Sequence, residues 1–291
     1  MAEIQNISED WGRHTGLEVQ TFIKGQLNGI SEDVESLQDA VPQAIATTTI
    51  DNIVAGNYQP DASDYREQTN RLLWAFKDHS TGDIVTLSLD SAPTLLNTTS
   101  SPFYNKQTYD AEAIYAVPSL ASCSGLNAAF FKQTNLQEIN FDGQDFSRVT
   151  NFESVFSGCS SITSINLSSS AKAGRYLSTC FSGCTALTTL SLGVWNMSNA
   201  ITVTNIAKNC PALTTVTGTL SGIGAAFTVD VSLDFSASTG LTRESAMVFI
   251  DGLVSPNGHT ATITFSDATY ALLTDVDINK ITAAGWVNGN A

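Results

Sequence analysis

The sequence of 291 residues has little charge, and above all little positive charge. It contains 13 Lys and Arg against 28 Asp and Glu, so the formal net charge is −15, and charged residues make up only 14% of the chain. The few cations are spread thinly and form no basic stripe that could neutralise the phosphates of a nucleic acid. We therefore expect no nucleic-acid partner.

Long apolar runs are also missing. No stretch is apolar enough over the length that a bilayer requires, so we expect no membrane insertion. The first eleven residues, Met1 to Trp11, lack the basic segment and apolar run of a secretory signal. We expect a protein that either stays where it is made or leaves the cell as part of something larger.

Catalytic and cofactor signatures are scarce. The three histidines, at positions 14, 79 and 259, lie in different segments, and none stands beside a Ser in a G-x-S-x-G sequence. Residues 275–279 begin like a calcium loop, but Lys280 stands where that loop needs Gly, so a helix capping box of Thr274 and Asp277 is the better interpretation. We expect no enzyme, and no catalytic, cofactor or metal site.

The middle of the chain contains an internal repeat. Segments that begin at Phe156 and Phe181 share the pattern F-S-G-C-x-x-[IL]-x-x-[IL]-x-L, a weaker copy begins at Ala207, and an earlier copy has Gln133 in the place of the cysteine. The period of 25 to 26 residues lies in the range of leucine-rich repeats and outside that of helical hairpin repeats. The repeated cysteines are Cys159, Cys184 and Cys210.

The repeat predicts an α/β fold, a leucine-rich-repeat solenoid of short parallel strands. Each copy supplies one strand, and segments such as 149–156 and 176–181 return the chain, as short helical turns. The repeated cysteines are expected to form a buried ladder of thiols and no disulfides. Cys180 and Cys184 are four residues apart, which also allows a metal or redox pair, but no histidine completes a ligand set.

We expect four parts along the chain. Residues 1–60 form a helical attachment arm, with helices near 16–28 and from Ser31, although an ordinary helical cap of the solenoid fits equally well. Residues 61–125 form an N-terminal cap and a degenerate repeat, residues 126–240 the repeats, and residues 241–291 an α/β cap. The candidate attachment residues of the arm are Trp11, Leu17, Phe22, Ile23 and Leu27.

Within the two caps the local patterns are specific enough to test. In the first, the apolar spacing of Tyr65 to Phe76 predicts a helix, followed by a turn at Thr81–Gly82, a strand at 83–89 and another near 113–115. In the second, a helix begins after Thr242, a strand spans 260–265, and Ser266 and Thr274 open further helices.

Three residues of the repeat region are candidates for binding. Trp195 interrupts the repeat where a loop is expected, so it is either an exposed ring that stacks on sugars or a plug of the core. Asp142 and Asp145 follow a repeat strand, and a carboxylate pair of this kind is what glycoside cleavage needs. As Asp-Gly and Asp-Phe-Ser turn residues they are explained more simply.

The pattern F-x-x-C-x-x-L-x-x-L-x-L of residues 156–167 and 181–192 resembles the BspA-like leucine-rich repeats of bacterial surface proteins, whose repeats imply adhesion. Residues 241–286 resemble a terminal unit of such proteins from Bacteroidetes and their phages. Residues 9–24 look like a start found in structural proteins of those phages, which implies an arm that docks onto a virion.

These resemblances imply a structural or fibre-like virion protein whose arm binds other virion proteins and whose repeats face a host glycan or protein. The alternatives are an adhesin of the bacterial cell surface and, with less support, a glycan depolymerase. The apolar face of the arm has little chain nearby to bury it, so we expect a homo-oligomer.

Overall fold

The computed structural model describes residues 73–89, 91–168 and 172–290. The chain divides into two compact units, Met1–Glu67 and Gln68–Ala291, and every described residue belongs to the second. The predicted arm, with Trp11, Leu17, Phe22, Ile23 and Leu27 and the predicted helices, therefore lies outside the described residues.

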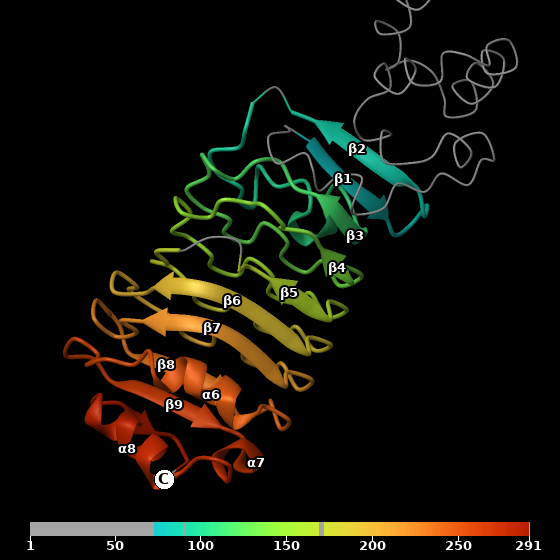
Figure 1. Cartoon of the computed structure of the whole chain (residues 1–291). Helices are drawn as coiled ribbons and strands as arrows, with labels where there is room; N and C mark the ends of the chain where they lie inside the picture. Colours follow the sequence, from blue (N-terminus) through green and yellow to red (C-terminus); the bar gives the residue numbers. More distant parts are fainter. Residues whose placement is uncertain (1–72, 90, 169–171, 291) are drawn as a thin grey trace, which may run out of the picture. The chain divides into compact units, whose positions relative to one another are not determined.

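The second unit is a mixed α/β structure with three small sheets and few helices (Figure 1). The first sheet has the order β2 (Ile84–Ser88), β1 (Leu73–Asp78), β3 (Ala111–Ala116), β4 (Glu138–Ile139). The second has the order β5 (Ser164–Asn166), β6 (Thr189–Asn196), β7 (Thr215–Ser221). The third has the order β10 (Val287–Asn288), β9 (Ala261–Phe265), β8 (Val231–Phe235).

Strands β3 to β7 follow one another in chain order, and each copy of the repeat contributes one of them (Figure 1). β3 pairs with β4, β5 with β6, and β6 with β7, all in parallel. Between β4, the last strand of the first sheet, and β5, the first strand of the second sheet, the Thr163 N–H donates to the Gln137 carbonyl. Further along, the Thr188 and Thr214 hydroxyls donate to the Thr163 and Thr188 carbonyls. The predicted strands therefore form, and each is held by its neighbours one repeat away.

On the return side, the predicted helical turns are wrong. Alternate backbone N–H groups bond to the next copy, as in Phe156 to Cys180 and Phe181 to Ile206, at 2.9 and 2.8 Å. The N–H groups between them bond three residues back, as in Ser157 to Ser154 at 3.1 Å. Ser154 and Thr179 have φ of +56° and +54° at equivalent positions, which interrupts any right-handed helix. Four residues later Gly158 and Gly183 have φ of +79° and +76°, where glycine avoids the strain of a side chain.

The core of the repeats contains two ladders of aromatic rings and thiols among its buried aliphatic side chains. Phe130, Phe156 and Phe181 are stacked, with ring centroids 5.2 and 6.1 Å apart and rings 11° from parallel. The thiols of the repeated cysteines each donate to the carbonyl of the phenylalanine one copy earlier, and all five cysteines of the chain are buried and free, as predicted. The three bonds are Cys159 to Phe130, Cys184 to Phe156 and Cys210 to Phe181, at 3.0, 3.2 and 3.1 Å.

Before the repeats, the predicted helix is wrong over residues 73–76, which belong to strand β1. Trp74 and Phe76 are both buried, at 1% and 0% exposure, and their rings pack edge-on against Phe103. β1 is sandwiched between β2 and β3, so its two neighbours satisfy the backbone and override the helical spacing. The turn at Thr81–Gly82 and the strands β2 and β3 form where predicted.

After the repeats, the predicted caps open the predicted helices. Thr242 caps α6 (Arg243–Ile250), Ser266 caps α7 (Asp267–Tyr270), and Thr274 forms a capping box with Asp277 at the start of α8 (Asp275–Ala283). β9 forms where a strand is predicted. Asp277 also receives two hydrogen bonds of 2.8 Å from Arg243, which ties α8 to α6.

A candidate binding groove on the strand face

Trp195 is not an exposed binding residue. Its side chain is 0% exposed, its ring lies 4.7 Å from that of Phe152, and its indole N–H donates to the Leu192 carbonyl at 2.7 Å. Since β6 continues through residue 196, the predicted loop is a strand, and the ring faces inward. Of the two interpretations of Trp195, the plug of the core is the correct one.

Lys172 is buried beside this tryptophan, at 2% exposure. Its ammonium group lies 5.3 and 5.7 Å from the ring centroids of Phe146 and Trp195 and donates to the Leu192 carbonyl at 3.3 Å. Burial lowers the pKa of Lys172 to about 8. The lysine therefore keeps a charge in the core at neutral pH, and the aromatic faces and a carbonyl stabilise it.

Asp142 and Asp145 are both exposed in the turn that follows β4. The Asp145 carboxylate accepts a hydrogen bond of 2.8 Å from the Ser147 N–H, and hydrogen bonds from Ser147 lower its pKa. The Asp142 N–H donates to the Asn140 side chain at 2.9 Å. These are the contacts of turn residues. A catalytic acid needs a raised pKa, and Asp145 has the opposite shift.

A groove of about 710 Å³ lies across the ends of β1, β3, β4 and β5. Ala113 of β3 pairs with Lys77 of β1 on one side and with Glu138 of β4 on the other, so a small side chain stands between two long ones. The short side chain of Ala113 between the longer side chains of Lys77 and Glu138 leaves the space of the groove. Its lining consists of Lys77, Glu112, Ala113, Tyr115, Gln137, Glu138, Ser160, Ser161, Thr163, Ser164 and Ala186.

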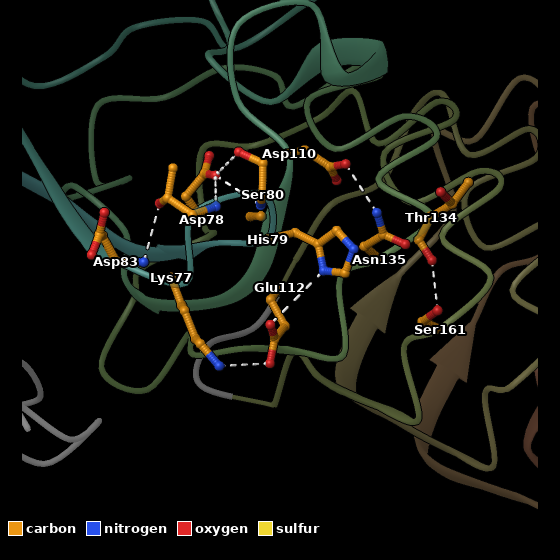
Figure 2. Close-up of polar contacts among 12 residues, drawn as sticks. Lys77, Asp78, His79, Ser80, Asp83, Asp110, Glu112, Thr134, Asn135 and Ser161 are labelled. Carbon is orange, nitrogen blue, oxygen red and sulfur yellow. Dashed lines mark hydrogen bonds and ion pairs between the residues drawn. The ribbon is translucent and has the colours of Figure 1, made fainter.

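At one end of the groove, Lys77 and His79 both point at the Glu112 carboxylate (Figure 2). The Lys77 ammonium donates to Glu112 Oε1 at 2.9 Å, and His79 Nδ1 lies 3.8 Å from Oε2. The hydrogen bond and charge of Glu112 raise the pKa of Lys77. Asn135 and Lys106 hold the Asp110 carboxylate nearby, each at 2.9 Å. The end of the groove is therefore a fixed network of ion pairs and hydrogen bonds.

Tyr115 and the hydroxyl groups form the rest of the groove. Partial burial raises the pKa of Tyr115, and the charge of Glu138 adds to the shift, so the phenol keeps its proton. On the far side, the Ser161 hydroxyl donates to the Thr134 carbonyl at 2.6 Å (Figure 2), and Thr163 and Ser164 are exposed. The lining thus offers a phenol, hydroxyls, an amide and carboxylates to a ligand.

The same polar character continues over the neighbouring strands. Ser164 pairs with Thr189 and Thr189 with Thr215, while Asn166 pairs with Ser191 and Ser191 with Thr217. None of these residues is charged, and all are exposed or half-buried. The face of β5 to β7 is therefore a flat array of hydroxyl and amide groups.

Within the described residues, no three His, Cys, Asp or Glu side chains gather in a way that could hold a metal ion. The helices of the same residues are too short or too polar for any of them to cross a membrane. Comparisons with protein-family models, with curated proteins and with solved structures each gave no match.

Sequence reasoning missed the groove. Its residues come from five separate segments, and Lys77 directly follows the predicted helix of residues 65–76, whose end is strand β1. One signal was available, since Ala113 in the predicted degenerate repeat precedes Glu138 by the repeat period, which places the two side by side. The antiparallel pairing that adds Lys77 has no repeat to indicate it.

Proposed function

We propose that this chain is a non-enzymatic structural component of a phage virion, of the fibre or appendage type, in which a leucine-rich-repeat solenoid presents a binding face. The repeat period, the parallel pairing of β3 to β7 and the bonds between successive copies support the solenoid. On this proposal the N-terminal residues attach the chain to other virion proteins as a homo-oligomer. The attachment is supported by the sequence resemblance, and the homo-oligomer by the apolar face of the predicted arm.

In this proposal, the ligand binds at the groove and at the hydroxyl-rich face of β5 to β7. Strands β3 and β4, and strands β5 to β7, are fixed to one another by parallel pairing, so their outward side chains keep a constant spacing. A surface that is rigid, polar and weakly charged suits recognition by many hydrogen bonds, as with a host glycan or protein. Turn contacts of Asp142 and Asp145 favour this role over glycan cleavage.

A bacterial cell-surface adhesin is the second candidate, since BspA-like repeats imply adhesion in either setting. The two differ in where the protein is found. We would compare phage particles and protease-shaved cells of one source culture by mass spectrometry, and look for peptides of the repeat region such as residues 136–148. A cytoplasmic enzyme of the host serves as the contamination control.

Enrichment in particles over that control supports the virion role. Recovery only from the cell surface contradicts it and leaves the adhesin.

A further inference from the structure

The groove between β1, β3, β4 and β5 has a composition that selects among ligand classes. Resting on the proposed binding function, we infer that this groove binds a neutral saccharide. Sugar hydroxyls donate and accept hydrogen bonds at once, so they need a lining that does both. The hydroxyls of Thr163, Ser164 and Tyr115 and the Gln137 amide are groups that do both. Glu138 accepts, and so do the Ser160 and Ser161 hydroxyls, which donate to the Thr134 carbonyl.

Charge argues against an acidic ligand. Lys77 is the single cation of the lining, and its ammonium group is already bound to Glu112 at 2.9 Å. Glu138, exposed beside it, repels a sulfate, phosphate or uronate. The net charge of −15 adds a repulsive field around the whole chain.

The backbone argues against a peptide. A peptide that adds a strand needs free N–H and carbonyl groups at a sheet edge. Beneath the groove, the Gln137 and Asn140 N–H groups donate to the Glu112 and Ile114 carbonyls of β3 at 2.8 and 2.9 Å. On the other side of β4, the Gln137 carbonyl accepts a hydrogen bond from the Thr163 N–H at 3.4 Å, so the chain itself bridges the two sheets there. The lining also has no aliphatic side chain larger than Ala113 and Ala186 that could anchor a peptide side chain.

Tyr115 supplies the apolar surface that a sugar requires. The C–H face of a pyranose ring packs on an aromatic ring while its hydroxyls bond around the rim. Tyr115 is half-buried and is the one aromatic residue of the lining. The volume of about 710 Å³ falls in the range of about 300–1,000 Å³ found for small-ligand sites.

The test uses the full chain on an array of neutral, amino and acidic oligosaccharides, with affinities for bound sugars measured by calorimetry. Tyr115→Ala removes the ring, and Glu138→Gln changes one exposed group at constant size. Thr239→Ala, at an exposed threonine outside both the groove and the face of β5 to β7, is the matched control. Each variant is checked by thermal unfolding.

We expect binding to neutral oligosaccharides, weakened about tenfold by Tyr115→Ala and by Glu138→Gln, and changed less than about twofold by Thr239→Ala. The exposed Glu138 keeps the test valid if Tyr115→Ala fails to fold. Binding of acidic sugars alone, binding of no sugar, or an affinity for neutral sugars that neither groove variant lowers overturns the inference. Particle localisation is measured independently, so a virion protein that binds no sugar leaves the proposed function standing.

Discussion

The repeats and the C-terminal end of the chain provide hydrogen-bond partners for their backbone N–H groups in different ways. In residues 126–168 and 172–221 no helix forms, and alternate N–H groups of each turn bond to the next copy, as Gly158 does to Ser182 and Gly183 to Lys208, both at 2.8 Å. Residues 241–290 contain three helices, each opened by a side-chain cap. A turn of the repeats therefore takes part of its hydrogen-bond partners from the next copy, whereas the C-terminal helices satisfy their first N–H groups with their own side chains.

The cysteine position shows the same contrast at the level of one side chain. In the repeats the thiols of Cys159, Cys184 and Cys210 donate to the previous copy. Toward the end Ser238 donates instead, to the Cys210 carbonyl at 2.9 Å, and Ser266 donates to the Ser238 carbonyl at 3.3 Å and also caps a helix. A thiol suits an apolar interior, and a hydroxyl suits a position that also serves a helix.

The largest loss of stability is expected from a change in the stack of phenylalanine rings in the repeats. Phe156→Ala removes the centre of the phenylalanine stack, and the cavity should lower the free energy of unfolding by about 3–5 kcal/mol, as measured by chemical denaturation. Leu272→Ala, at a residue of the C-terminal end that is 53% exposed, is the control and should change it by less than about 0.5 kcal/mol. Equal losses in the two variants would show that the stack does not hold the repeats together.

The buried Lys172 gives the repeats a pH dependence. Its pKa is about 8 in the fold against 10.5 in the unfolded chain, so between these values the unfolded chain binds more protons and stability rises with pH. The stability advantage of Lys172→Met over the unaltered chain should shrink by roughly 3 kcal/mol from pH 7 to pH 10.5.

The comparison must be made against this variant, because the buried thiols act in the opposite direction. Burial raises the pKa of Cys159 to about 12 and that of Cys210 to about 11. The folded chain then keeps protons that the unfolded chain loses, so both forms lose stability above about pH 9. A difference between the two forms that does not change with pH would contradict the placement of Lys172.

A smaller effect is expected at the C-terminal end. Thr274→Ala removes the cap of α8 and one half of its capping box, and should cost about 1–2 kcal/mol in thermal or chemical unfolding. Thr274→Ser keeps the hydroxyl and is the control. Equal stability of the alanine variant and the unaltered chain would mean that the end does not rely on its caps.

The smallest effect is expected at the thiol ladder. Cys184→Ala removes one of two donors to the Phe156 carbonyl, the other being the Cys159 N–H at 3.0 Å, and should cost about 1 kcal/mol. Cys184→Ser keeps a donor of similar size. Chemical denaturation of both variants tests the ladder. If serine is as costly as alanine, the thiol acts by packing and its hydrogen bond contributes nothing.

Most of the correct predictions of strands and buried thiols came from the sequence repeat. Equal spacing placed β5, β6 and the thiols, and side-chain caps placed the C-terminal helices, because both signals are local. The strand β1 was missed since its pairing with β3, from 33 residues away at Asp78 and Ala111 to 41 at Ala75 and Ala116, overrides local spacing. The sequence left two interpretations of Trp195 open, and the inward one is correct because β6 is longer than the other repeat strands.

The central claim is that each turn of the repeats is held by the next copy, and amide hydrogen exchange of the folded chain tests it most directly. The N–H groups of Phe156, Gly158, Phe181 and Gly183 lie in turns, outside every helix and strand. We predict exchange as slow as that of the strand amides of β6, since opening them requires separating two copies. Exchange at the rate of free surface turns, with β6 still protected, would contradict the account.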